Sequence, residues 1–165
     1  MPFDTRAFRN AMGCFATGVA VATAQDPETG PVGVTINSLS SVSLDPPLIL
    51  FCLNSKAHSF ATFIRTRTFA INILAEDQRE LSVRFSMWPL EKRWAGLAHS
   101  ISENGNPLLA DCQAVLDCTT QTQHDGGDHV ILIGRVVDLH CHPVGRPLVY
   151  YRGHYALLDQ RTEPS

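Results

Sequence analysis

The apolar positions of this chain follow two spacings, and the commoner is the alternation of apolar and polar residues that predicts strands with one buried face. Alternation, or a short apolar run bounded by turn residues, predicts strands over residues 19–23, 32–37, 48–53, 69–74, 114–123 and 129–140, and a last strand or extended segment over 148–158. Segments rich in Gly, Pro and Asp, at 25–31, 45–47, 125–128 and 143–147, predict the turns between them. Residues 48–53 are apolar throughout, which is typical of an interior strand.

The second spacing, with apolar residues three and four positions apart, predicts short helices over residues 5–12, 59–66 and 78–86. Asp4 is placed to cap the first of these helices, and Gly13 is placed to end it. Residues 87–112 show little periodicity and contain helix-breaking prolines, so we expect a long excursion there. The tail from Gln160 is polar, and we expect it to be loose.

These elements predict a single domain over residues 1–165 that is mainly β with short helices. Six or seven strands separated by turns indicate a mainly antiparallel sheet. Closing that sheet into a barrel is the favoured way to remove its exposed edges. Full-length helices follow the strands too rarely for a doubly wound parallel sheet.

Charge narrows the choice of partners. Lys and Arg number 13 against 16 Asp and Glu, the net charge is -3, and Lys56 and Lys92 are the only lysines. Because binding to a phosphate backbone needs clustered positive charge, we expect no nucleic acid partner. No apolar run approaches the ~18 residues of a membrane span, so we expect no membrane partner.

The five cysteines favour a reducing compartment. Their number is odd and no CxxC pair occurs, so reduced thiols in the cytoplasm fit better than a disulfide framework. Arg6 and Arg9 precede small and apolar residues in the manner of a signal peptide. Glycine and threonine interrupt that stretch, however, and its later alternation favours a strand. We therefore expect a cytoplasmic protein.

The densest polar cluster, residues 35–43, follows a predicted strand and offers hydroxyl groups and one amide, among them Thr35, Asn37, Ser38 and Ser41. Such groups suit the edge of a flavin ring, because neutral hydroxyls and amides match both donors and acceptors. The alternative is that these residues only close turns.

A second cluster, residues 54–59, places Lys56 and Ser59 directly before a predicted helix, where backbone N–H groups and the helix dipole favour a phosphate. The alternative is that Ser59 is a simple N-cap. Arg84, on the next predicted helix, could add a second positive group or could face solvent.

A third cluster, residues 126–129, combines a Gly-Gly turn with Asp128, which could hold one nitrogen of His129. The imidazole could then contact a nicotinamide or its pyrophosphate; the alternative is a plain hairpin turn. No GxGxxG, GxxxxGK[ST] or GxSxG motif is present. His140 and His142 share one face of a strand, but two ligands do not complete a tetrahedral site, so we expect no metal.

Taken in order, these segments resemble the short-chain flavin reductase family, the reductase components of two-component flavin-dependent monooxygenases. The resemblance is carried by residues 8–13 with 16–19, 33–47, 69–74 with Gln78, 127–129 followed by 133–136, and 147–155. Each motif is weak alone, but the series spans nearly the whole chain. The resemblance implies an FMN-binding split β-barrel, a homodimer with flavin near the subunit interface, and the use of NADH or NADPH to reduce FMN or FAD for a partner monooxygenase.

The resemblance also implies roles for particular residues. Those lining the isoalloxazine ring would be Thr35, Asn37, Ser38, Ser41 and Val42. Lys56 and Ser59 would reach the flavin phosphate, and His129, Tyr155 and Gly153 would lie where the nicotinamide docks. An FMN-binding oxidase of the pyridoxamine-phosphate-oxidase type and a non-catalytic flavin- or haem-storage module are the alternatives.

Overall fold

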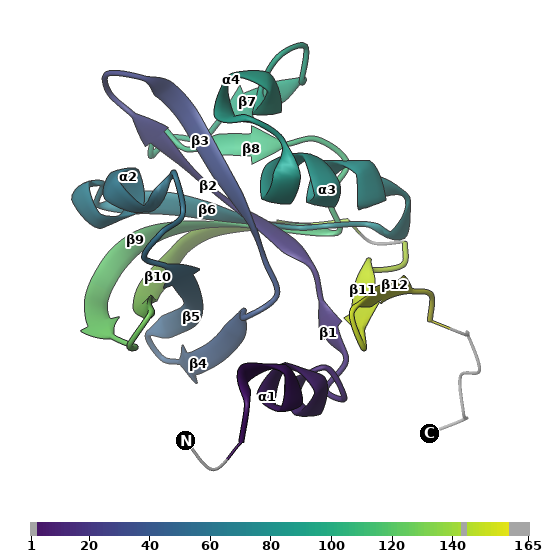
Figure 1. The fold of residues 1–165 in the computed structure, drawn as a ribbon. Coiled ribbons are helices and arrows are strands. Elements are labelled where there is room, and N and C mark those ends of the chain that lie inside the picture. Colours follow the sequence, from purple (N-terminus) through teal and green to yellow (C-terminus); the bar gives the residue numbers. More distant parts are fainter. Residues whose placement is uncertain (1–2, 143–144, 159–165) are drawn as a thin grey trace.

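The computed structural model describes residues 3–142 and 145–158 and is mainly β (Figure 1). Seven antiparallel strands form the main sheet in the order β3-β2-β6-β9-β10-β5-β4. These strands are β2 (Ala20–Asp26), β3 (Gly30–Ile36), β4 (Ser40–Leu44), β5 (Pro47–Asn54), β6 (Thr68–Ile73), β9 (Ala114–Asp125) and β10 (His129–Cys141). The predicted fold class, mainly β with an antiparallel sheet, is therefore confirmed. The predicted tail from Gln160 and part of the predicted turn at 143–147 lie outside the described residues.

Two smaller sheets accompany the main one. β1 (Thr17–Gly18), β11 (Val149–Tyr151) and β12 (His154–Ala156) form the first, and β7 (His99–Ile101) pairs with β8 (Pro107–Leu109) in the second. The prediction of one extended segment over 148–158 is wrong, because β11 and β12 form a tight hairpin there. Its turn, Arg152–Gly153, has both residues at positive φ, 48° and 82°.

The prediction of a closed barrel is also wrong, because the strand order ends at β3 on one side and at β4 on the other. The segment after β3 is bonded to β5 through the side chain of Ser38 and not through the backbone hydrogen bonds of paired strands. The Ser38 hydroxyl donates to the Cys52 carbonyl at 3.2 Å and accepts from the Cys52 N–H at 2.9 Å. β4 then pairs with β5 across a register shift between Ser41 and Ser43. A short, irregular edge strand resists pairing with other chains, so closure is not needed.

The helices are α1 (Thr5–Met12), α2 (Phe60–Arg65), α3 (Arg79–Met87) and α4 (Leu90–Arg93), with a 3-10 turn, η1 (Glu76–Gln78), before α3. The three predicted helices are confirmed to within about a residue at each end. Asp4 caps α1 as predicted, by accepting a hydrogen bond from the Ala7 N–H at 2.5 Å. The excursion over 87–112 contains α4, β7 and β8, which have three or four residues each and are too short to show a period. No helix within the described residues is long and apolar enough to span a bilayer.

The first core cluster is formed mainly by inward-facing residues of the main sheet, together with Phe63 of α2, and Phe85 of α3 belongs to a second cluster. Within the first cluster, Phe51 of β5 packs edge-on against Phe69 of β6, with ring centroids 5.2 Å apart. β5 buries Ile49, Phe51 and Leu53 on its inner face, whereas its outer, equally apolar face stays partly exposed. The prediction of an interior strand thus holds for one face only.

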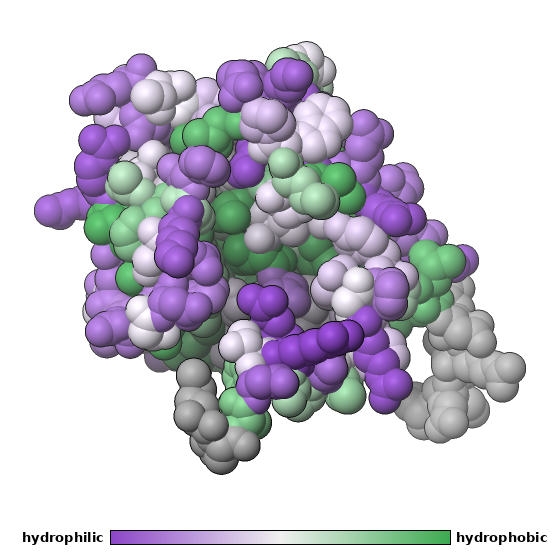
Figure 2. Space-filling model, viewed as in Figure 1, coloured by the Kyte–Doolittle hydropathy of each residue, from purple (hydrophilic) through white to green (hydrophobic). Residues whose placement is uncertain are grey.

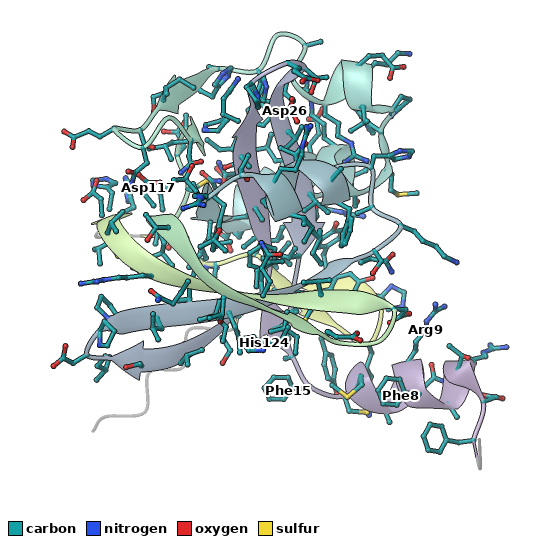
Figure 3. All side chains as sticks on the ribbon, turned by 90° about the vertical axis from the view of Figure 1, so that its left-hand side faces the viewer. Phe8, Arg9, Phe15, Asp26, Asp117 and His124 are labelled. Carbon is teal, nitrogen blue, oxygen red and sulfur yellow. The ribbon has the colours of Figure 1, made fainter. Side chains whose placement is uncertain are left out.

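Two buried aspartates tie the peripheral segments to this core (Figure 3). Asp26, at the end of β2, accepts hydrogen bonds from the backbone N–H groups of Glu28 and Thr29, so the turn after β2 is shorter than predicted. It also binds Thr62 at 2.8 Å and Arg65 at 2.6 Å, which fixes α2. These contacts, the Glu28 N–H first among them, hold the pKa of Asp26 well below its usual range despite burial.

Asp117 of β9 attaches the excursion, residues 87–112, to the main sheet in a similar way. Its carboxylate accepts from the side-chain amides of Asn104 at 2.8 Å and Asn106 at 2.7 Å. Because Asp117 and Asn106 are both buried, these bonds anchor the β7–β8 segment to the main sheet.

Candidate functional site

A close backbone contact positions the first part of the site. Phe85 of α3 packs directly on Gly33 of β3, where any Cβ atom would lie 2.6 Å from the phenyl ring. Ser82 lies one turn earlier on the same face of α3 and is therefore brought against the end of β3. Between α3, β3 and the β11–β12 hairpin lies a cleft of about 200 Å³, lined by Val19, Thr35, Ile36, Asn37, Ser82, Ser86, Tyr150 and Tyr155. Figure 2 shows this face hollowed near its middle, with apolar side chains inside a polar rim.

Hydrogen bonds through Ser82 link the two walls of this cleft. The Thr35 hydroxyl donates to the Ser82 carbonyl at 2.7 Å, and the Ser82 hydroxyl lies 2.8 Å from the Tyr155 hydroxyl. The Tyr155 ring packs edge-on against Tyr150, and the Arg79 guanidinium lies 5.0 Å from its centroid. Ser82 itself is only 1% exposed. The phenol is therefore held in one orientation at the mouth of the cleft.

Ser82 was not predicted from the sequence as a site residue. The only available signal was its position three residues before Phe85 on a helix with that apolar residue facing the core. That signal places Ser82 near the core but says nothing of Thr35 or Tyr155, which approach it from distant segments.

The rest of the polar cluster follows the edge of the sheet away from the cleft. Ser38 bonds to the backbone of Cys52, as described above, and so uses its hydroxyl to attach the chain to β5. Ser41 and Val42 lie on β4 and are exposed, Val42 by 46%. The structure thus brings Thr35, Asn37 and Tyr155 together, with the other members of the cluster alongside.

A second group forms where β5 ends and β10 begins. His129 pairs with Asn54 across the two strands, and the Ser55 N–H donates to the Asp128 carbonyl at 3.0 Å. The predicted 54–59 and 126–129 clusters, separate in the sequence, are therefore neighbours. Ser59 is 1% exposed, does not cap α2 with its side chain, and has a buried hydroxyl without a hydrogen-bond partner among the described residues.

Asp128 orients the imidazole of His129 as the sequence suggested. The distance from Asp128 Oδ1 to His129 Nδ1 is 2.7 Å, and the His129 side chain is 39% exposed. The hydrogen bond to His129 and the charge of His129 are the main causes that lower the pKa of Asp128, and the charge of Lys56 is the smallest. An aspartate acceptor selects the tautomer with a proton on Nδ1, which leaves Nε2 available to a ligand.

Ser38 lies between the cleft and the second group. Ser38 sits opposite Cys52, which pairs with Ile131, and Asn54 pairs with His129 two residues further along β5. Two strand spacings and two residue steps put the Ser38 and His129 backbones roughly 10 Å apart across the sheet and roughly 7 Å along it.

Two predicted residues lie outside both groups. The guanidinium of Arg84 donates to the carbonyls of Lys92, at 3.1 Å, and Ala95, and lies 4.9 Å from the centroid of the Trp88 ring, so it holds the start of the excursion. Gly153 lines a separate cavity between α1 and the β11–β12 turn.

A family model described as "Flavin reductase like domain" matches residues 12–159. The reductase subunit Stc3 of stachydrine N-demethylase from Rhizobium meliloti is 43% identical over 93% of this chain and 66% of its own length. HsaB, the reductase subunit of a flavin-dependent monooxygenase from Rhodococcus jostii, is 39% identical over 98% of this chain and 83% of its own. SmoA, an FMN reductase (NADH) from Agrobacterium fabrum, is 40% identical over 96% of this chain and 88% of its own.

The fold comparison agrees. The NADH:FAD oxidoreductase SgcE6 from Streptomyces globisporus, solved with NAD and FAD fragments, superposes with a TM-score of 0.92 at 30% identity, covering 99% of this chain and 98% of its own. This chain spans just under two thirds of the stachydrine relative, at 66%. The family model nevertheless covers nearly all of this chain, from the end of α1 past β12. The chain therefore belongs to the flavin reductase like family, as its sequence motifs implied.

Proposed function

We propose that the protein is an NAD(P)H:flavin oxidoreductase that reduces FMN or FAD and supplies the reduced flavin to a partner monooxygenase. The observation that carries this proposal is that Ser38 joins a neutral hydroxyl-and-amide cleft to β5, whose end carries the Lys–Ser–His group. The three relatives and the solved structure named above support it, since their names describe reductases or oxidoreductases of this kind.

The flavin ring would bind along the Thr35–Val42 segment. Thr35, Asn37 and Ser38 offer neutral polar groups at the end of β3, and Ser41 and Val42 continue this surface along β4. The outer face of β5 beside them is apolar and partly exposed, which suits a flat aromatic ring. Neutral contacts of this kind hold either oxidation state with modest affinity, as a flavin that must leave requires.

The flavin phosphate would lie at Lys56 and Ser59. The fit rests on the Ser59 hydroxyl, which is buried and lacks a hydrogen-bond partner in the described part of the chain. A phosphate oxygen supplies the acceptor that this hydroxyl lacks, and the exposed Lys56 supplies the opposite charge. Arg84 is occupied with backbone carbonyls, so we assign it to holding the excursion in place.

The nicotinamide would dock at Tyr155, with Gly153 beyond it on the same hairpin; His129, which the resemblance assigns to the same ring, lies in the other group. The chemistry that the flavin and the nicotinamide would supply when bound is hydride transfer from the reduced nicotinamide to the flavin. The protein contributes no acid or base to that step; it holds the two rings face to face, which makes the transfer effectively unimolecular. Asp128 fixes the imidazole of His129, and Ser82 fixes the phenol of Tyr155.

The dimer and the compartment are parts of the same proposal. Phe8 and Met12 on α1 and Phe15 just after it are each more than half exposed, as expected of a surface that a second copy covers. All five cysteines are free thiols, which suits the cytoplasm.

The test is NADH and NADPH oxidation by the purified protein, with and without added FMN, FAD and riboflavin. Oxidation that saturates with added flavin is expected. A yellow protein that retains its flavin on gel filtration and oxidises neither nucleotide would instead support the alternative, an FMN-binding oxidase or flavin-storage protein on the same fold.

A further inference from the structure

A cavity of about 420 Å³ lies between the C-terminal end of α1 and the turn of the β11–β12 hairpin. It is lined by Arg9, Asn10, Gly13, Cys14, Arg152 and Gly153. Two of these six residues are arginines, and none is acidic. We call it the Arg9–Arg152 cavity.

Backbone contacts build the cavity. The Arg152 N–H donates to the Gly13 carbonyl at 2.8 Å, which pins the hairpin turn to the end of α1. A Cβ atom at position 13 would lie 3.4 Å from the Arg152 Cα, so the hairpin turn packs against the end of α1 at van der Waals distance. The contact brings Arg9, in the last turn of α1, to the same cavity as Arg152.

Arg152 occupies a backbone conformation that disfavours it. Its φ is 48°, and Asp111 is the only other non-glycine residue with positive φ in the described part of the chain. Glycine or asparagine would adopt this conformation more easily, and strain of this kind is concentrated at functional positions. The backbone conformation does not explain an arginine at position 152, so we attribute it to a function of the side chain.

Neither arginine is neutralised. Within residues 3–142 and 145–158, Arg9 and Arg152 form no ion pair. The Arg152 guanidinium lies 5.3 Å from the centroid of the Tyr151 ring, which orients it without cancelling its charge. Arg9 extends from α1 toward the body of the molecule (Figure 3). Two guanidinium groups on one cavity match the oxygens of a phosphate.

We propose that the Arg9–Arg152 cavity binds a phosphate or pyrophosphate group of the nicotinamide nucleotide, an inference that rests on the proposed function. Tyr155 faces the flavin cleft, and the Arg152–Gly153 turn lies two to three residues away on the same hairpin, roughly 7–10 Å along the strand. A dinucleotide whose ring docks at Tyr155 can thus reach the cavity. The flavin phosphate is assigned to Lys56 and Ser59 in the other group.

Cys14 allows the cavity to be tested without turnover. Its thiol is exposed and lines the cavity, whereas the exposed thiol of Cys141 lies elsewhere. We expect inorganic pyrophosphate to slow the alkylation of Cys14 by the neutral reagent N-ethylmaleimide and to leave the alkylation rate of Cys141 unchanged. Mass spectrometry measures both rates. Arg152→Asn is the test variant, because asparagine tolerates the left-handed backbone at this position. In this variant, protection of Cys14 should need roughly tenfold more pyrophosphate, which is the loss of affinity typical of one charge-assisted hydrogen bond.

Kinetics then identify the ligand. With riboflavin as acceptor, which carries no phosphate, Arg152→Asn and Arg9→Ala should raise the KM for the nucleotide about tenfold and change kcat little. A rise for NADPH alone would assign the cavity to the 2′-phosphate, and a rise for both nucleotides to the pyrophosphate. Arg6→Ala removes an equal charge from α1 outside the cavity and should change neither KM.

Two outcomes would overturn the inference. One is a rate of Cys14 alkylation that pyrophosphate does not change; the other is an effect of Arg152→Asn that appears with FMN and vanishes with riboflavin, which would give the cavity to the flavin. Wild-type protein that oxidises no NAD(P)H would refute the proposed function, while protection of Cys14 would still reveal an anion site.

Discussion

Lys56 and Lys92 are the only lysines in the chain, and they form a matched pair for testing the phosphate site. Lys56 lies in the turn three residues before Ser59, whose hydroxyl has no hydrogen-bond partner within the described residues, whereas Lys92 lies on α4 in the excursion. We expect Lys56→Ala to weaken FMN binding about fivefold, because an exposed charge contact is worth roughly 1 kcal/mol, and to leave riboflavin binding unchanged. Fluorescence titration of both flavins measures this. Lys92→Ala should affect neither, and an equal loss of FMN and riboflavin in Lys56→Ala would remove Lys56 from the phosphate.

At the same scale, sequence reasoning located residues whose chemistry is local. The Asp128–His129 contact joins adjacent residues, and its bond is found as expected. Ser82 was missed because its role depends on the packing of Phe85 against Gly33. The spacing of residues along the sequence does not reveal such a contact between two elements. That Arg9 and Arg152 line one cavity was missed for the same reason. It depends on a hairpin that the pattern of apolar residues over 148–158 does not show.

Among the elements, α2 depends most on a single side chain. A six-residue helix is not stable alone, and α2 is held by Asp26 through Thr62 and Arg65. Because folding lowers the pKa of Asp26, its stabilisation is complete above the unfolded pKa near 3.9 and is lost as pH falls further. We expect Asp26→Asn to lower Tm by several degrees at pH 7, and this difference from wild type to stay constant down to about pH 5 and shrink below about pH 4. Thermal unfolding monitored by circular dichroism measures both.

Asp138→Asn is the control for this prediction, because Asp138 is exposed and bonds only to the N–H of the next residue. Its Tm should follow that of wild type at every pH. A deficit in Asp26→Asn that persisted unchanged at pH 3 would mean that the charge of Asp26 does not stabilise α2.

The elements also show how far periodicity alone can predict the fold. Helices of six to nine residues with an apolar face were predicted almost to the residue, and so were the long strands β9 and β10. The four-residue α4 and the three-residue β7 and β8 were not, since each is too short to repeat its apolar spacing. Closure was predicted incorrectly because it depends on how β3 reaches β5, where one serine hydroxyl replaces a ladder.

For the molecule as a whole, α1 raises the question of what covers it. It has eight residues, none of them buried, and a helix of that length is marginal in water. One end is attached through Gly13 to the β11–β12 turn, which leaves the apolar side chains of Phe8 and Met12 exposed. A second copy of the chain that packs on this surface would supply the missing burial.

We therefore expect sedimentation equilibrium to show a dimer, and Phe8→Asp to shift it toward monomer at micromolar concentration. Burying a phenylalanine side chain contributes about 2 kcal/mol per subunit, so two copies lost from a symmetric interface weaken association by a factor of roughly 10³. Met87→Asp is the matched control, because Met87 is 78% exposed on α3, away from α1. A wild-type monomer would refute the dimer and leave α1 attached only through its end. A dimer that Phe8→Asp leaves intact while Met87→Asp dissociates it would place the interface away from α1.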